Sequence, residues 1–227
     1  MSSRLVVALL VILAQMGWPA GLAMAGRPVT VRIQLPMEAR LDTAGYRRIL
    51  VGGFLHNDSP VMDIEKEIVR VLRKDLDKNS DFLILADPPP SLPEQRLEDL
   101  KKNAAFFMAL AEEFRADLII SGQILFTTVD QSGFVQGEFI SPTTGRRTIR
   151  SYYVDRTGYT LKLDLIFVRG SDGQLVYDTS FVQDMILNTD ESDPLSVFFD
   201  LAERFHDSYL GIMVPRSRTE IRYLFTQ

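Results

Sequence analysis

Apolar residues recur with two different spacings in the first third of this chain. Over residues 29–35 (VTVRIQL) valine, isoleucine and leucine alternate with polar residues, and this period of two predicts a strand with one buried face. Residues 48–55 (RILVGGFL) are apolar at consecutive positions, as expected for a strand covered on both faces. Gly52 and Gly53 interrupt that run, which predicts a bulge or a close backbone approach.

Helical spacing follows. From Ile64 to Leu76 an apolar residue stands at every fourth position among charged neighbours, which predicts an amphipathic helix. The Asp-Ser-Pro sequence at residues 58–60 is a suitable start, and Asn79 a suitable end. Residues 97–114 predict a second helix. Upstream of it, the Ser-x-x-Glu sequence at residues 91–94 has the spacing of a capping box.

Short apolar runs lie next to these helices. Residues 82–85 (FLIL) and 117–128 (DLIISGQILFTT) predict buried strands, the second of them the most strand-like segment of the chain. Ser121 within it is interpreted as a packing position. The order strand, strand, helix, strand, helix, strand is typical of an α/β sheet with helices packed on it.

The second half changes character. We expect strands over residues 134–140, 151–169 and 174–185, with a turn at 141–145 and a hairpin turn at 171–173. A helix opening at residues 193–194 (Asp-Pro) follows, and a short strand at 221–225 can close the chain. The predicted fold class is therefore α/β: a mixed sheet with helices packed on it, then an antiparallel β-meander and a C-terminal helix.

Residues 1–25 have the three parts of a secretory signal peptide. Arg4 supplies the positive start, residues 5–14 (LVVALLVILA) form an apolar core, and small residues at 23 and 25 precede Gly26. The apolar run is shorter than the ~20 residues that cross a bilayer, although an uncleaved anchor helix is the alternative. We therefore expect an exported protein, periplasmic or associated with the outer membrane, with residues 26–227 forming a single α/β domain and no membrane span after cleavage.

Composition narrows the function classes. Hydrophobic residues make up 46% and charged residues 24%, a globular balance. The net charge is −5, and Arg4 is the only charged residue of the leader, so cleavage makes the chain more acidic; nucleic acid is not an expected partner. The chain has no cysteine, which excludes disulfides, thiol catalysis, cysteine-bound metal and a lipid anchor attached through cysteine.

Candidate chemistry is sparse. The two histidines, His56 and His206, stand far apart in sequence without metal-ligand spacing, and they are interpreted as unrelated side chains. A metal-assisted hydrolase that uses His56 and nearby acids stays an alternative. The sequence has neither a nucleophile elbow nor a glycine-rich phosphate loop, so we predict a non-enzymatic protein without cofactor or metal.

One segment stands out in this acidic protein. Residues 146–159 combine four arginines with tyrosines, two residue types that supply contact area and directed hydrogen bonds at binding surfaces. An exposed edge hairpin kept soluble by its arginines is the alternative interpretation. The predicted partner-binding residues are Arg146, Arg147, Arg150, Tyr152, Tyr153, Arg156 and Tyr159. A second basic group, Arg216, Arg218 and Arg222, lies near the C-terminus.

Several of these segments resemble a known group. Residues 48–54 before a helix and then residues 81–85 are similar to the opening of envelope proteins related to the curli secretion lipoprotein CsgG, in the TolB N-terminal-like superfamily. Residues 114–124 (FRADLIISGQI) resemble the "lGAdyiitG.i" signature of that group, and residues 163–181, with Gly173 at the turn, resemble its later hairpin. The similarity covers residues 48–181.

The resemblance implies an α/β sandwich that binds partners and has no enzymatic activity. This chain departs from the group because it lacks the lipoprotein cysteine and an obvious membrane-spanning hairpin. The leading hypothesis is an accessory or scaffold protein that supports a cell-envelope assembly or export system through contacts with envelope proteins. A ring-forming structural subunit, and hence a homo-oligomer, is a further alternative.

Overall fold

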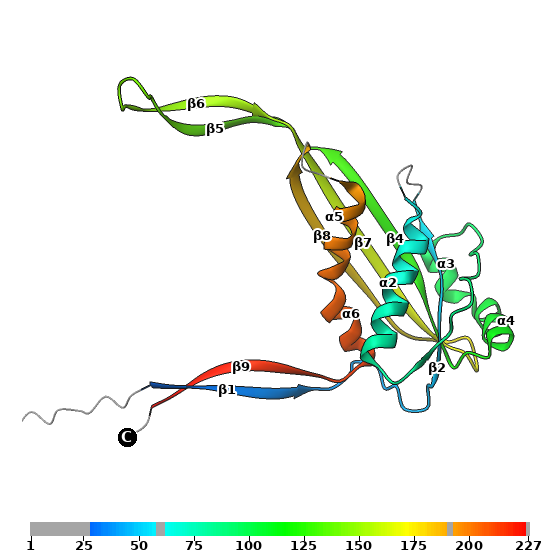
Figure 1. Cartoon of the computed structure of the whole chain (residues 1–227). Coiled ribbons are helices and arrows are strands. Elements are labelled where there is room, and N and C mark those ends of the chain that lie inside the picture. The colour runs from blue at the N-terminus through cyan, green and yellow to red at the C-terminus, as the bar shows by residue number, and fades with distance from the viewer. Residues whose placement is uncertain (1–27, 58–61, 190–192, 226–227) are drawn as a thin grey trace, which may run out of the picture. The chain divides into compact units, whose positions relative to one another are not determined.

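The computed structural model describes residues 28–57, 62–189 and 193–225, which divide into two compact units (Figure 1). In the first unit the first and last strands, β1 (Pro28–Met37) and β9 (Arg216–Phe225), pair as a two-stranded sheet. The second unit spans residues 38–216 and is called the body here. All of the helices in the described residues belong to the body.

The body is built on a five-stranded mixed sheet. β2 is parallel to both of its neighbours, β3 and β4, whereas β7 runs antiparallel to both of its neighbours, β4 and β8. This arrangement confirms the predicted mixed sheet with an antiparallel extension. The strands, in their order across the sheet, are β3 (Leu83–Ile84), β2 (Arg48–His56), β4 (Leu118–Asp130), β7 (Arg156–Arg169) and β8 (Leu175–Asn188).

The predicted bulge is present in β2. Its register with β4 shifts between Val51 and Phe54, and side chains occupy the backbone groups that the ladder loses. The Phe54 N–H donates to Glu65 Oε1 at 2.9 Å, and the buried Ser121 hydroxyl donates to the Gly53 carbonyl at 2.7 Å. A Cβ on Gly53 would lie 2.4 Å from a backbone carbonyl oxygen, so this close approach requires glycine.

Helix α2 (Ile64–Asn79) packs one apolar stripe on the sheet. Asp63 caps its start by accepting from the Lys66 N–H at 3.0 Å, and the helix ends at Asn79, as predicted. The start predicted at residues 58–60 lies outside the described residues.

Two groups of helices cover the two faces of the sheet. α2, α5 (Pro194–Glu203) and α6 (His206–Met213) pack on one face, and α3 (Leu97–Lys102) and α4 (Ala104–Phe114) on the other (Figure 1). The sequence predicted one helix where each of the pairs α3–α4 and α5–α6 stands. The predicted capping box does not cap a helix, because α3 begins six residues after Ser91 with Arg96 at its N-cap.

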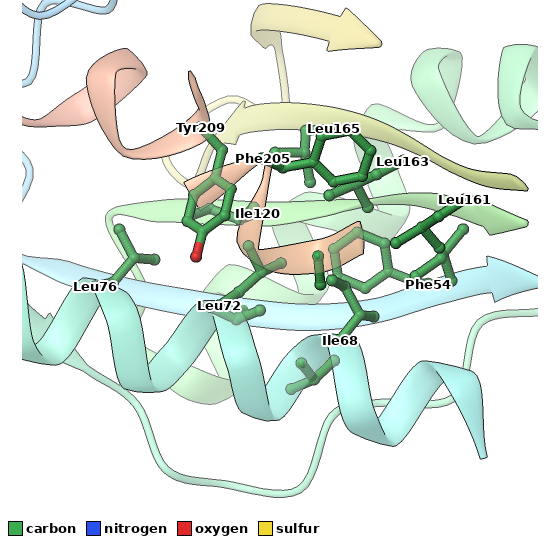
Figure 2. Packing of buried hydrophobic residues seen from close by; sticks show 14 of the residues in the cluster. Phe54, Ile68, Leu72, Leu76, Ile120, Leu161, Leu163, Leu165, Phe205 and Tyr209 are labelled. Atoms are coloured by element: carbon green, nitrogen blue, oxygen red, sulfur yellow. The ribbon is translucent and has the colours of Figure 1, made fainter. Parts of the chain in front are cut away.

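The larger hydrophobic cluster fills the space between the sheet and α2, α5 and α6. Figure 2 shows side chains of β2, β4 and β7 meeting those of α2 and the C-terminal helices. The Tyr209 phenol of α6 donates a hydrogen bond to the Asp75 carboxylate of α2. Burial first, and this hydrogen bond second, raise the pKa of Tyr209 far above its ordinary value, so the phenol stays neutral.

Residues 133–154 do not join the sheet. The sequence predicted a strand over 134–140 and a single strand over 151–169, both in a meander. Instead β5 (Gly133–Ile140) and β6 (Arg147–Val154) form a separate two-stranded hairpin, and the predicted long strand breaks at Asp155 into β6 and β7. None of the helices in the described ranges has the length and apolar character needed to cross a bilayer.

Candidate partner-binding surface

The hairpin formed by β5 and β6 is paired along its whole length. Its register runs from Gly133 opposite Val154 to Ile140 opposite Arg147. The turn predicted at residues 141–145 closes it: the Ser141 N–H donates to the Arg146 carbonyl at 3.0 Å, and Gly145 has a φ of 65°, which glycine adopts without strain.

One face of the hairpin carries a row of apolar side chains. Phe134 and Tyr153 stand opposite each other with their rings edge to face, 5.3 Å between centroids. Ile149 lies farther along this face, opposite Glu138, whose carboxylate is 3.6 Å from the Arg147 guanidinium. This face therefore offers two aromatic rings and two isoleucines, Ile140 and Ile149, beside an exposed ion pair.

The other face pairs aromatic rings with small and cationic groups. Tyr152 lies over Gly137, where an added Cβ would be 3.0 Å from the ring; an aromatic neighbour of this kind shields the glycine backbone. Arg150 lies over the Phe139 ring, 4.2 Å from its centroid, in a cation–π contact. Arginine and aromatic side chains are thus placed side by side by the strand register.

These side chains remain in contact with solvent. Phe134 is 78% exposed and Ile149 73% exposed, although apolar residues of that size are usually covered. A hairpin of two strands has no second layer to bury either face, and such a ribbon is only marginally stable in water by itself. Two exposed apolar faces on one ribbon are characteristic of a surface that meets a partner.

The structure brings together five of the seven predicted binding residues. Four of them stand on β6 (Arg147, Arg150, Tyr152 and Tyr153), and Arg146 lies in the turn before it. Arg156 is exposed at the start of β7, where its N–H donates to the Ser132 hydroxyl at 3.0 Å.

Tyr159 requires a correction. It is 3% exposed, and its ring stacks on Phe126 at 5.9 Å between centroids, inside the larger cluster of the body. The alternation of β7 turns this side chain towards α5 and the core, so it is not available at the surface.

Sequence reasoning missed the apolar half of the surface. Phe134, Phe139 and Ile140 were assigned to a strand of the sheet, where their side chains would be covered, and Ile149 was not singled out. The available signal was the pattern of residues 133–140: apolar side chains occur at both odd and even positions, together with two glycines. That pattern fits a two-stranded ribbon with two contact faces equally as well as it fits a strand that is buried on both faces.

A cleft of about 910 Å³ lies where the hairpin leaves the sheet. Its walls combine carboxylates and hydroxyls with both tyrosines of β6. Hydrogen bonds from Ser132 hold the pKa of Asp130 below its usual value, so this carboxylate is charged at neutral pH. The lining residues include Asp130, Ser132, Tyr152, Tyr153, Asp155 and Thr157.

Charge is unevenly distributed around this surface. Residues 133–156 hold four arginines against two acidic residues, in a chain whose net charge is −5. The hairpin is therefore basic and the cleft at its root carries carboxylates, so a partner would meet both signs of charge within one contact area.

The histidines take separate structural roles. His56 Nδ1 lies 3.1 Å from the Phe54 carbonyl and 3.9 Å from Glu65, whose other oxygen already accepts from the Phe54 N–H. His206 on α6 lies 3.1 Å from the neighbouring Asp207. Within the described ranges no group of three or more histidine, cysteine or acidic residues is arranged to hold a metal ion.

Comparison with known proteins gives fold likeness only. No protein-family model matches the chain, and no curated protein matches its sequence. Among solved structures, the PelC dodecamer from Paraburkholderia phytofirmans is 12% identical with a TM-score of 0.38, covering 84% of this chain and 100% of that one. The lipoprotein GNA1162 from Neisseria meningitidis is 14% identical with a TM-score of 0.37, covering 72% and 97%.

The C-terminal domain of LpoB from Salmonella enterica is 12% identical with a TM-score of 0.33, covering 63% of this chain and 87% of that one. Likeness at this level carries no argument about function. Membership in the group that the sequence resembles therefore stays a prediction.

Proposed function

We propose that this chain is a non-enzymatic accessory or scaffold protein of the cell envelope, and that it acts outside the cytoplasm by binding another envelope protein through the β5–β6 hairpin. The observation that carries the proposal is the exposure of apolar and aromatic side chains on both faces of a two-stranded ribbon. The predicted leader at residues 1–25 supports the location.

The composition of the hairpin supports a protein partner. Tyrosine, phenylalanine and arginine are enriched in the buried centres of protein interfaces, because they combine large contact area with directed polar contacts. Tyr152, Tyr153, Arg147 and Arg150 stand within one strand of eight residues. A partner that covers either face also removes the cost of leaving the apolar side chains in water.

The alternatives have less support in the described residues. A metal-assisted hydrolase would need His56 to share a cleft with free carboxylates. The neighbouring Glu65 carboxylate, however, already accepts a hydrogen bond from the Phe54 backbone N–H. For a ring-forming subunit, the partner of the hairpin would be a second copy of this chain. The experiment below distinguishes that outcome by mass.

The test is photo-crosslinking in the living source cell. A photoreactive amino acid replaces Ile149 or Phe134 on the hairpin and, as matched controls, Leu83 or Met108, which are exposed apolar residues of the body. We expect an adduct of one defined mass from both hairpin positions and none from the controls. Adducts from neither hairpin position, or equal adducts from all four, would contradict the proposal.

A second arm uses substitution. Replacing Arg147, Arg150, Tyr152 and Tyr153 by alanine removes the anchors while the apolar crosslinking position at Phe134 is kept. The adduct from Phe134 should fall at least roughly tenfold, because anchor residues dominate interface energetics. The same number of exposed residues replaced on α2 and α4 should leave it unchanged.

A further inference from the structure

The β1–β9 ribbon has an alternating pattern of apolar residues, but these residues are not buried in the ribbon. β1 alternates strictly, with valine, isoleucine, leucine and methionine at the odd positions from Val29 to Met37. This alternation predicted a strand with one buried face. Instead, within the described part of the chain, β1 pairs only with β9, and more than a third of the surface of each of Ile33, Leu35 and Met37 is exposed.

β9 repeats the pattern in another form. Ile221 and Tyr223 occupy one side of the strand and are more than half exposed. Arg218, Glu220 and Arg222 occupy the other side, where the Glu220 carboxylate lies 2.6 Å from Arg222 and 4.0 Å from Arg218. The alternating apolar residues of β1, and Ile221 and Tyr223 of β9, thus lie on the opposite side of their own strand from its arginines.

The ribbon is basic in an acidic protein. Residues 28–37 and 217–225 contain three arginines (Arg32, Arg218 and Arg222) and one acidic residue, Glu220, whereas the whole chain has a net charge of −5. Arg216, the first residue of β9, is already engaged with Asp207 of α6 at 2.7 Å. Glu220 can neutralise only one of the other three arginines, so the ribbon keeps a net charge of +2 that can meet an external anion.

In the sequence, the ribbon begins directly after the predicted leader. The predicted leader ends at Ala25, so only Gly26 and Arg27 separate the segment that enters the bilayer during export from the start of β1. If the leader is cleaved as predicted, the ribbon contains the first strand of the mature chain. Arg27 adds one more basic residue at this point.

We infer that the β1–β9 ribbon is a second contact surface, which binds a bilayer rich in anionic phospholipid. The arginines contact lipid phosphates, and the apolar side chains with Tyr223 enter the interfacial region, where aromatic rings are favoured. A second copy of the ribbon fits less well, because pairing two copies would bring six arginines together. The inference is independent of the proposed role of the hairpin.

The test is sedimentation of the exported protein with lipid vesicles, after mass spectrometry has verified that residues 1–25 are absent. One set of vesicles contains phosphatidylcholine alone, and the other contains phosphatidylcholine and phosphatidylglycerol in equal parts. We expect binding only to the anionic vesicles, weakening as salt is raised because screening shortens the reach of the arginines.

Matched triple variants locate the binding surface. R32Q/R218Q/R222Q should lower the partition coefficient on anionic vesicles by at least roughly tenfold, since each arginine near the surface contributes to binding. R146Q/R147Q/R150Q removes the same charge from the hairpin and should bind like the wild type. R32K/R218K/R222K keeps the charge and should also bind, which shows that the loss in the glutamine variant is electrostatic rather than structural.

Several results would overturn the inference. Equal binding to both kinds of vesicle would remove the role of anionic lipid. A loss in the hairpin triple variant as large as in the ribbon triple variant would show that net charge alone drives binding. A ribbon triple variant that halves the solution mass in light scattering, with lipid binding unchanged, would assign the ribbon to a second copy of the chain. The crosslinking experiment on the hairpin is unaffected by any of these outcomes.

Discussion

The five-stranded sheet of the body and the β5–β6 hairpin are made of the same residue types, but only the sheet has layers on both faces. Phe54 in β2 is 1% exposed because it packs against α2 (Figure 2). Phe134 in β5, in contrast, is 78% exposed. The difference lies in the number of strands and the presence of helices, since a ribbon of two strands presents both faces to solvent.

The comparison assigns different roles to similar sequences. In the body, apolar burial stabilises the fold, at about 25 cal/mol for each Å² removed from water. In the hairpin, and in the β1–β9 ribbon, the same kinds of side chain remain exposed and are available to a partner or a lipid surface. Removing an apolar side chain should therefore damage folding in one region and binding in the other.

The largest expected effect is in the body. Phe54→Ala should lower the free energy of unfolding by about 3–5 kcal/mol, because it leaves a cavity in a packed cluster. Phe134→Ala, the matched change in the hairpin, should alter it by less than about 0.5 kcal/mol. Urea denaturation followed by circular dichroism measures both. Comparable losses in the two variants would mean that the hairpin is part of the core.

A smaller effect is expected at the contact between α6 and α2. Tyr209→Phe removes the hydrogen bond to Asp75 and should cost about 1–2 kcal/mol at neutral pH. The pKa of Tyr209 is raised in the folded protein, so its contribution is present below the ordinary tyrosine pKa of ~10 and is lost as pH rises above it.

The difference in unfolding free energy between wild type and Tyr209→Phe should therefore narrow in alkaline solution. The measurement is urea denaturation of both proteins at neutral pH and again at about one pH unit above the ordinary tyrosine pKa. If the difference in unfolding free energy instead widens as pH rises, the conclusion that the buried Tyr209 phenol is neutral would be contradicted.

A third prediction concerns two left-handed residues, one in each region. Gly145 in the hairpin turn has a φ of 65°, while Arg115 at the end of α4 has a φ of 54° and carries a side chain there. A left-handed backbone conformation costs a non-glycine residue about 1 kcal/mol. Replacement by glycine removes this strain, but part of the gain is lost because glycine has more conformational freedom in the unfolded chain.

Arg115→Gly should consequently raise the free energy of unfolding by about 0.5 kcal/mol. Arg115→Ala, which keeps a Cβ, serves as the control and should give no gain. A loss of stability in the glycine variant, measured by thermal unfolding, would mean that the Arg115 side chain makes contacts worth more than the strain.

Periodicity identified the elements of the body well. The consecutive apolar residues of β2, the fourfold spacing of α2 and the glycine pair at the bulge all act locally, through burial and backbone sterics that neighbouring residues specify. The helix breaks at Asn103 and near Arg204 were missed, because apolar spacing continues across them while only the backbone path changes.

The exposed surfaces were harder to predict, because alternation indicates that a strand has two unlike faces but not what covers them. Residues 29–35 show the alternation of a half-buried strand, yet the described residues provide no layer over β1. The prediction that Tyr159 binds a partner was wrong for a related reason: Tyr159 is close to the arginines in sequence, but its side chain points into the core. The five arginines and tyrosines of the hairpin could be singled out because charge and aromatic content are visible without knowledge of pairing, and their role in binding stays a prediction.

The smallest expected effect separates the hairpin from the fold. β4 ends at Asp130 and β7 begins at Arg156, and the Gln131 N–H donates to the Arg156 carbonyl at 2.9 Å, so the two strand ends already stand side by side. Replacing residues 134–153 by a short glycine turn should change the free energy of unfolding by less than about 0.5 kcal/mol, because neither hairpin face packs on the core. Both crosslinking positions are removed with this segment, so the variant is tested by vesicle sedimentation, in which it should still bind anionic vesicles. If instead the body unfolds at lower urea, the exposed aromatic residues support the sheet, and a contact role for them would need another surface.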